Sequence, residues 1–302
     1  MTFFDHQVNG FAGVDFQQPA LTAAELDHAL SALRARGTRI LLTLITAPIA
    51  QLERQFARIE SLLRESAFAE VVAGYHLEGP YLSPLPGFHG AHPAELMKAP
   101  DLREFDRLQA AAGGRLRLVT LAPEWPGSAS FIRELTSRGI CTSIGHSDAD
   151  NAAIDAAIEA GLRLCTHLGN GVPGQLPRHD NVMQRLLARD ELVAAFIPDG
   201  IHLPPPVLKN FVRAKPRDRV IFTTDCMAAA GAGPGSYSIG RLTVEVGEDG
   251  VVREPGKSNF AGSSLTMDRA CANVQRYLGW SAGEATAACG ERAAAAVGLR
   301  AS

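Results

Sequence analysis

Four side chains that could bind a metal ion or transfer a proton stand directly after short apolar runs of the sequence. They are Glu78, His146, His167 and Asp225. A glutamate with two histidines makes a complete ligand set for a catalytic zinc ion that keeps one position open for water. Simpler interpretations exist, because a histidine after a strand often forms only a local hydrogen bond, and carboxylates cap turns and helices. The coincidence of four such residues on four runs favours the metal site.

Eight apolar runs, the candidate strands, alternate with helical segments. They are Phe3–Gln7, Arg39–Leu44, Val71–Leu77, Leu116–Leu121, Cys141–Ile144, Leu164–His167, Val193–Ile197 and Val220–Thr224. Most of them are continuous, which is typical of parallel strands buried on both faces. The pattern predicts an α/β fold, a (β/α)8 barrel of the TIM type, whose reactive groups gather at the carboxyl ends of the strands. The four side chains would then meet at one rim.

Local signals place several helix ends. The segments Thr22–Glu25 and Ser281–Glu284 are capping boxes and predict helix starts, the second for a final alanine-rich helix. Gly37 would end the first of these helices, and Gly161 would end a helix over Asp148–Ala160.

A strand-like segment follows the eighth run. Ser238–Val246 alternates between polar and apolar residues, Glu248–Gly250 reads as a turn, and Val251–Arg253 continues as a strand. This pattern predicts a β-hairpin insertion. No linker or internal repeat divides the chain, so residues 1–302 are interpreted as a single barrel domain.

Composition excludes several classes of protein. The 302 residues are 46% hydrophobic, which is too apolar for disorder, and no uncharged apolar run reaches about 18 residues. The net charge of −3 gives no reason to expect nucleic acid or a membrane surface as a partner. Five scattered cysteines indicate free thiols of a reducing cytoplasm, and the N-terminal residues lack the pattern of a signal peptide.

Further motifs surround these residues. They are His76–Pro84 (His-Leu-Glu-Gly-Pro-Tyr-Leu-Ser-Pro), Gly90–Pro93, Gly145–Ser147, Thr166–Asn170, Asp199–His202, Thr224–Gly231 and Phe260–Met267. In this order the set resembles the signature of N-acetylglucosamine-6-phosphate deacetylases in the amidohydrolase superfamily, and it extends over nearly the whole chain. The combination is specific, although no single tetrapeptide would be.

The resemblance implies one divalent metal ion, zinc with iron as the alternative, on Glu78, His146 and His167. It implies Asp225 as the catalytic carboxylate and a catalytic role for His92 beside the developing oxyanion. Substrate contacts would come from Ala91, Asn170, Gly171, Arg178, His202, Phe260, Ala261 and Gly262. The position of the residues after the strands selects the same four central side chains independently.

One departure concerns the first strand. Many amidohydrolases carry His-x-His there and bind a second metal ion, whereas this chain has Gln7 and Asn9, so that second position is expected to be vacant. His6 is one place out of register and would point to the opposite face of the strand, where it would serve packing.

Two further departures concern the substrate and the domain content. The family usually has Arg-Glu-Pro-Gly where this chain has Arg178–Asn181 (Arg-His-Asp-Asn), which leaves recognition of a phosphate open. The family also has a small β-sandwich domain built from both chain ends. This sequence starts at the first strand and stops after the last helix, so we expect a barrel without that domain.

The expected function is metal-dependent removal of the N-acetyl group from an amino sugar, N-acetylglucosamine-6-phosphate above all, giving acetate and glucosamine-6-phosphate. Two alternatives stay open: a deacylase for an unphosphorylated or nucleotide-linked N-acyl substrate, and a catalytically silent sugar-binding relative. We also expect a homodimer, because the alanine-rich helix Ser281–Val297 favours close packing and the wall that normally faces the β-sandwich needs a cover.

Overall fold

The computed structural model describes residues 2–256 and 260–299, and its central element is a parallel sheet curled into a barrel. In sheet order the strands are β1 (Phe3–Val8), β4 (Thr38–Ile45), β5 (Val72–Glu78), β6 (Leu116–Leu121), β7 (Cys141–Ile144), β8 (Leu164–Cys165), β9 (Val193–Phe196) and β10 (Val220–Phe222). The first and last strands meet where the Asn9 amide donates to the Cys226 carbonyl at 2.8 Å. The predicted (β/α)8 barrel is confirmed; two of the predicted strands, Leu116–Leu121 and Cys141–Ile144, have the observed bounds, and the other six differ by one or two residues at one or both ends.

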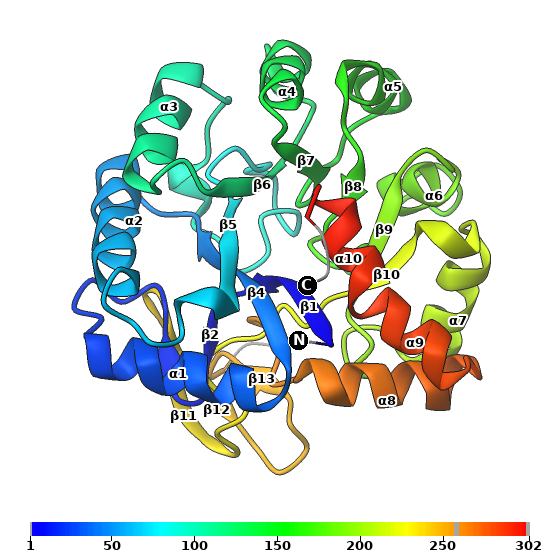
Figure 1. Cartoon of the computed structure of the whole chain (residues 1–302). Coiled ribbons are helices and arrows are strands. Elements are labelled where there is room, and N and C mark those ends of the chain that lie inside the picture. Colours follow the sequence, from blue (N-terminus) through cyan, green and yellow to red (C-terminus); the bar gives the residue numbers. More distant parts are fainter. Residues whose placement is uncertain (1, 257–259, 300–302) are drawn as a thin grey trace.

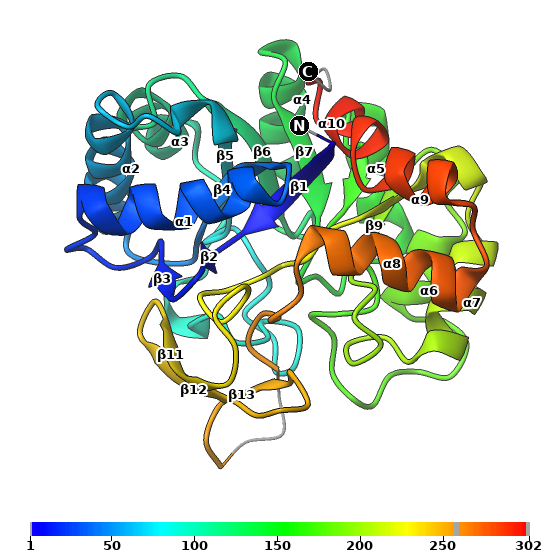
Figure 2. The ribbon, with the colours of Figure 1, turned by 60° about the horizontal axis from the view of Figure 1, so that its bottom comes forward.

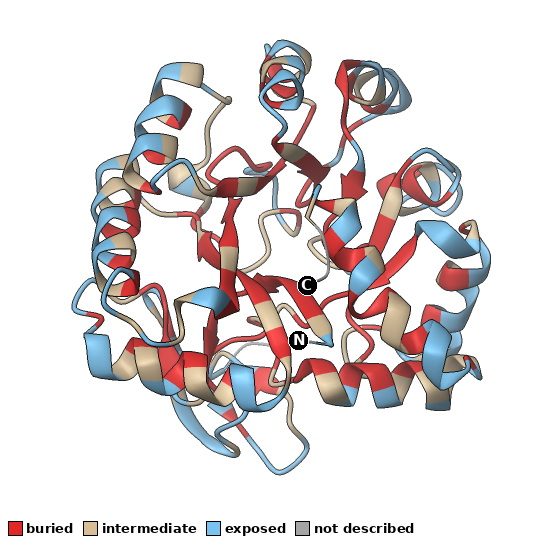
Figure 3. Cartoon of the chain, in the orientation of Figure 1, coloured by how far each residue is buried: buried red, intermediate tan, exposed pale blue. Residues whose placement is uncertain are grey.

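Helices surround the barrel and bury one face each (Figures 1 and 3). They are α1 (Ala23–Ala35), α2 (Ile49–Leu63), α3 (Leu102–Ala111), α4 (Ser128–Ser137), α5 (Asn151–Ala160), α6 (Val182–Leu187), α7 (Pro205–Arg213), α8 (Met267–Leu278), α9 (Ala282–Ala288) and α10 (Glu291–Ala296). Both predicted capping boxes are formed, and Gly161 ends α5 in a left-handed conformation. No helix in the described ranges is long and apolar enough to cross a membrane.

The last helical region departs from the prediction. Ser281–Val297 was predicted as one helix, but α9 and α10 are separate and the chain bends between them at Gly290. A Cβ on Gly290 would lie 2.4 Å from the carbonyl oxygen of Thr2, so the chain approaches β1 too closely there for a side chain. The bend lets Ala293, Ala294 and Val297 pack on the lower barrel interior, beside Phe4, Leu41, Leu118, Leu164, Ala195 and Ile221.

The insertion after β10 is a small antiparallel sheet of three strands, β11 (Gly235–Ile239), β12 (Leu242–Val246) and β13 (Val252–Arg253). The prediction of Ser238–Val246 as one strand was wrong, because the chain reverses at Gly240, whose φ of +57° suits glycine. A short hairpin, β2 (Gly10–Phe11) and β3 (Val14–Asp15), lies beside it, and the Asp15 carboxylate accepts the Gly240 amide at 2.9 Å. Figure 2 shows this insertion at the opposite end of the barrel from the two termini.

Candidate active site

The four central side chains lie at the carboxyl ends of four strands. Glu78 is the last residue of β5, and His146, His167 and Asp225 follow β7, β8 and β10 within three residues. The three that follow their strands have positive φ angles, 51° at His146, 28° at His167 and 49° at Asp225. A left-handed backbone is uncommon for residues other than glycine, and residues held in it cluster at functional sites.

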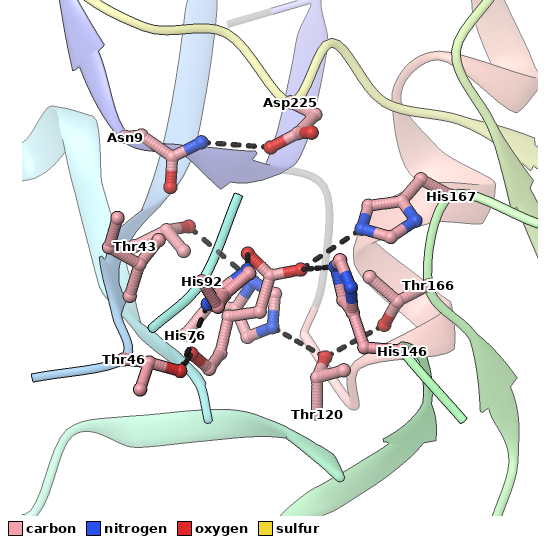
Figure 4. Close-up of polar contacts among 12 residues, drawn as sticks. Asn9, Thr43, Thr46, His76, His92, Thr120, His146, Thr166, His167 and Asp225 are labelled. Carbon is pink, nitrogen blue, oxygen red and sulfur yellow. Dashed lines mark hydrogen bonds and ion pairs between the residues drawn. The ribbon is translucent and has the colours of Figure 1, made fainter. Parts of the chain in front are cut away.

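Three imidazoles surround the carboxylate of Glu78. Its Oε1 lies 3.0 Å from His167 Nε2 and 3.5 Å from His146 Nε2, and its Oε2 lies 3.7 Å from His92 Nε2. Figure 4 shows His92, His146 and His167 converging on this point. The structure therefore brings the three predicted ligands together and adds His92. Within the described residues, the group compact enough to hold a metal ion is Glu78, His92 and His146, which has His92 in the place of the predicted ligand His167.

The donor set fits a cation. His146 Nδ1 lies 2.9 Å from the carbonyl oxygen of Phe88, which only accepts, so Nδ1 carries the proton of the neutral ring. Its Nε2 then presents a lone pair to the carboxylate, and this repulsion is relieved by a cation between them. A histidine whose other nitrogen donates to a carbonyl is the usual arrangement in metal sites. Carboxylate and imidazole donors together suit a divalent metal ion.

Burial and neighbouring charges shift the pKa values of Glu78 and Asp225 in opposite directions. Burial alone would raise the pKa of Glu78, yet hydrogen bonds from His146 and His167, when these rings carry both protons, hold it well below its ordinary value. Burial, reinforced by the charge of Glu78, raises the pKa of Asp225 to about 7. Two nearby carboxyl groups with such different proton affinities can take different roles, one as a permanent anion and the other as a proton carrier.

Asp225 is oriented by the first strand. The side-chain amide of Asn9 donates to Asp225 Oδ1 at 2.8 Å, which leaves Oδ2 available (Figure 4). Gln7 is fully buried, and neither atom of its side-chain amide has a hydrogen-bond partner. His6 is also fully buried without a partner, and burial lowers its pKa to about 3, as suits a neutral packing residue.

A cavity of about 670 Å³ opens above these residues. It is lined by most of the predicted substrate contacts, namely Ala91, Asn170, Gly171, His202, Phe260, Ala261 and Gly262. Arg178 does not line it and is exposed, while Asp180 of the same loop pairs with Arg185 of α6 at 2.6 Å. No lysine or arginine of the described ranges lines this cavity.

His202 is held in a fixed orientation. Its Nδ1 lies 2.6 Å from Oδ2 of Asp199, whose Oδ1 accepts the backbone amides of Ile201 and His202. The carboxylate thereby leaves Nε2 of the ring for a ligand. The ring also packs against Phe260, with 5.0 Å between the centroids.

Sequence reasoning missed two parts of the site. One is a layer of hydrogen bonds inside the barrel, in which His76 Nε2 lies 2.7 Å from Thr120 Oγ1 and Thr120 lies 2.7 Å from Thr166. The alternation of β5 could have revealed it, because His76 is two residues before Glu78 and points to the same face. The other part is the aliphatic lining from β4 and the inserted sheet, Ile45, Ile239 and Leu242.

Comparisons with known proteins agree with this geometry, although no family model matches the chain. The sequence is 34% identical to the N-acetylglucosamine-6-phosphate deacetylase of Bos taurus, over 98% of this chain and 74% of that protein. It is 31% identical to the N-acetylgalactosamine-6-phosphate deacetylase of Escherichia coli O157:H7, over 94% of this chain and 74% of that protein.

Solved structures give the same result. A mutant of the Mycobacterium smegmatis N-acetyl-D-glucosamine-6-phosphate deacetylase, in complex with N-acetyl-D-glucosamine-6-phosphate, superposes with a TM-score of 0.88. That comparison has 31% sequence identity and covers 98% of this chain and 77% of the other. The Thermotoga maritima enzyme gives a TM-score of 0.85 at 26% identity, covering 98% of this chain and 78% of the other.

Proposed function

Because the chain belongs to the N-acetylglucosamine-6-phosphate deacetylase family, we propose that it hydrolyses N-acetylglucosamine-6-phosphate to acetate and glucosamine-6-phosphate. The observation that carries this proposal is the convergence of Glu78, His92, His146, His167 and Asp225 at the base of one cavity. The relatives are named for this activity, and the cavity is of the size that encloses small ligands.

We assign the metal ligands as Glu78, His146 and His167, and we propose zinc as the ion. Zinc suits a set of one carboxylate and two imidazoles, and the protonated Nδ1 of His146 supports this role for its Nε2. A bound divalent ion would polarise the acyl oxygen and make a bound water more acidic.

The remaining chemistry belongs to the side chains. Asp225 Oδ2 takes a proton from water while the water oxygen bonds to the acyl carbon, and it returns the proton to the sugar nitrogen as the carbon–nitrogen bond breaks. Asn9 keeps the other oxygen, Oδ1, engaged, so one carboxylate oxygen handles the proton.

His92 is assigned to the developing negative charge on the acyl oxygen. Its Nδ1 lies 2.9 Å from the hydroxyl of Thr46, whose single proton can go to this nitrogen or to the carbonyl oxygen of Glu78 at 3.4 Å. When Thr46 donates to Nδ1, the Nε2 of His92 carries a proton and can donate to the oxyanion, in contrast to the Nε2 of His146.

A second candidate activity is favoured by the absence of lysine and arginine from the described lining of the cavity. A phosphate group usually requires cationic side chains or a helix N-terminus. An N-acyl amino sugar without a 6-phosphate, or with a nucleotide attached, therefore remains the second candidate substrate.

Acetate release distinguishes these substrates. We expect metal-loaded protein to release acetate fastest from N-acetylglucosamine-6-phosphate in a panel that includes N-acetylgalactosamine-6-phosphate, both free sugars and a nucleotide-linked sugar. Fastest turnover of an unphosphorylated member would support the second candidate. Protein that holds stoichiometric metal and releases acetate from none of them would refute both.

We also propose that residues 1–302 form one barrel domain, that the protein is a homodimer, and that it is located in the cytoplasm. The five cysteines are free, which agrees with a reducing compartment. The argument for a dimer from the alanine-rich region is weakened, because α9 and α10 bury their alanines within their own chain. The remaining support for the homodimer is that symmetric dimers are the commonest oligomers of soluble proteins.

A further inference from the structure

A second cavity of about 350 Å³ lies next to the active-site cavity. It is enclosed by the end of β4, the first turn of α2, the short 3-10 helix Ala94–Leu96 with the preceding Pro93, and the reversal between β11 and β12. Four residues line both cavities, namely Ile45, Ala91, Ile239 and Leu242. We call these four the partition, because their side chains separate the two spaces.

The partition is held from both sides. Ile239 and Leu242 face each other across the tight turn of β11 and β12, and Asp15 fixes that turn through the Gly240 amide. On the barrel side, Gln17 accepts the backbone amide of Ile45 at 3.0 Å. Ile45, Ala91 and Leu242 pack against the apolar cluster that contains Ile239 and Val244.

The interior of the second cavity suits a hydrocarbon. The amide of Gln17 donates to the carbonyls of Asn9 and Thr43, and that of Gln55 donates to the carbonyls of Phe16 and Gln18. These polar groups are therefore already satisfied. The charged residues Glu95 and Arg241 pair with each other at 2.8 Å and are largely exposed. An apolar group in this cavity would leave the hydrogen bonds of Gln17 and Gln55 intact and gain contacts with the aliphatic lining.

The strand order sets the direction in which an acyl chain would point. Ile45 belongs to β4, the second strand of the barrel, whereas Asn170 and Gly171 follow β8, the sixth. The second and sixth strands of an eight-stranded barrel lie opposite each other. The two carbon-chain substituents of an amide also leave the carbonyl in different directions. If the sugar contacts Asn170 and Gly171, as the resemblance implies, the acyl chain would point toward the partition.

We propose that the partition limits the length of the acyl group that this enzyme removes, and that thinning it lets longer N-acyl chains enter the second cavity. This inference rests on the proposed deacetylase function. The reaction is otherwise the same: water oxygen bonds to the acyl carbon, the carbon–nitrogen bond breaks, and the nitrogen takes a proton. The products would be the amino sugar and a longer carboxylate.

The test compares kcat/KM for N-acetyl- and N-butanoylglucosamine-6-phosphate. Leu242→Ala should raise the butanoyl-to-acetyl ratio by about tenfold or more, since one or two methylenes in an apolar pocket have effects of this order. Val246→Ala is the matched control, because it shortens an aliphatic side chain of the same strand that lines neither cavity. Its ratio should equal that of the wild type.

A double variant that fills the second cavity again tests whether the acyl chain binds there. Ala47 lines the second cavity alone, so adding Ala47→Leu to Leu242→Ala should reverse the gain with the butanoyl substrate. If Leu242→Ala fails to fold, Ile45→Ala is the substitute variant, because it shortens a partition side chain that belongs to the barrel strand β4. An unchanged ratio in folded variants, an equal change in Val246→Ala, or no reversal by Ala47→Leu would overturn the inference. Wild-type protein without activity on the acetyl substrate would instead refute the proposed function, and this inference with it.

Discussion

The side-chain amide of Asn9 donates a 2.8 Å hydrogen bond to Oδ1 of Asp225, and the two residues are 216 positions apart in the chain. This contact joins the end of β1 to the end of β10, where the barrel closes. Asn9 occupies a position that carries a metal-binding histidine in many related amidohydrolases. Here its amide orients the group that we assign to proton transfer.

Replacing Asn9 with alanine should reduce kcat while metal content and KM change little. A hydrogen bond to a charged group is worth about 1.5–3 kcal/mol, which corresponds to about ten- to a hundredfold in rate. Steady-state kinetics with elemental analysis measures this. Loss of the metal in Asn9→Ala would instead show that Asn9 is a ligand.

Asp225→Asn should keep the metal and lower turnover by about 10²–10⁴-fold or more, because the shape of the site is preserved and the proton acceptor is removed. Elemental analysis and acetate release on the same sample give both values. Simultaneous loss of metal and activity would contradict the assignment and make Asp225 a structural ligand.

Metal content should be one equivalent per chain, since the amide side chains of Gln7 and Asn9 are poor substitutes for imidazoles at a second position. His167→Ala should lose most of this metal, whereas His92→Asn should retain it and lower kcat. His92 also faces Glu78, as His167 does. Loss of the metal in His92→Asn and its retention in His167→Ala would therefore make His92 the ligand and His167 the group beside the oxyanion. Two equivalents in the wild type would refute the single-metal assignment.

Arg178→Ala tests recognition of the phosphate. Arg178 is exposed and lies outside the lining of the cavity, so its predicted contact requires movement of the loop. If it binds phosphate, KM should rise about tenfold for the phosphorylated sugar and stay unchanged for the free sugar, as expected for a charge-assisted hydrogen bond. Equal KM values of mutant and wild type on the phosphorylated sugar would show that Arg178 does not bind the phosphate.

Light scattering at micromolar concentration should give the mass of a dimer. Among the described residues, the exposed large hydrophobic side chains are Leu85, Val207 and Phe260, which lie on separate segments. That surface does not require an apolar cover. A clean monomer mass would refute the homodimer and agree with a polar outer wall.

The positions of Glu78, His146, His167 and Asp225 followed from local sequence because each comes at the end of an apolar run. Continuous burial identifies a parallel strand, and parallel strands of a barrel carry their carboxyl ends to one rim. The capping boxes at Thr22 and Ser281 were equally local, since their hydrogen bonds join residues three apart. These features depend on interactions between residues close in the chain, so the sequence is enough to predict them.

Other features depended on contacts between distant segments. The bend at Gly290 arises from its approach to Thr2, and the separation of Ile45 from Asn170 arises from closure of the sheet. The reversal at Gly240 is held by Asp15, which belongs to another hairpin. No spacing along the chain encodes such pairs. The sequence by itself determined which residues could do chemistry and on which rim they stand. Only the tertiary structure decided which of them touch, because side-chain direction after a strand depends on loops packed from elsewhere in the chain.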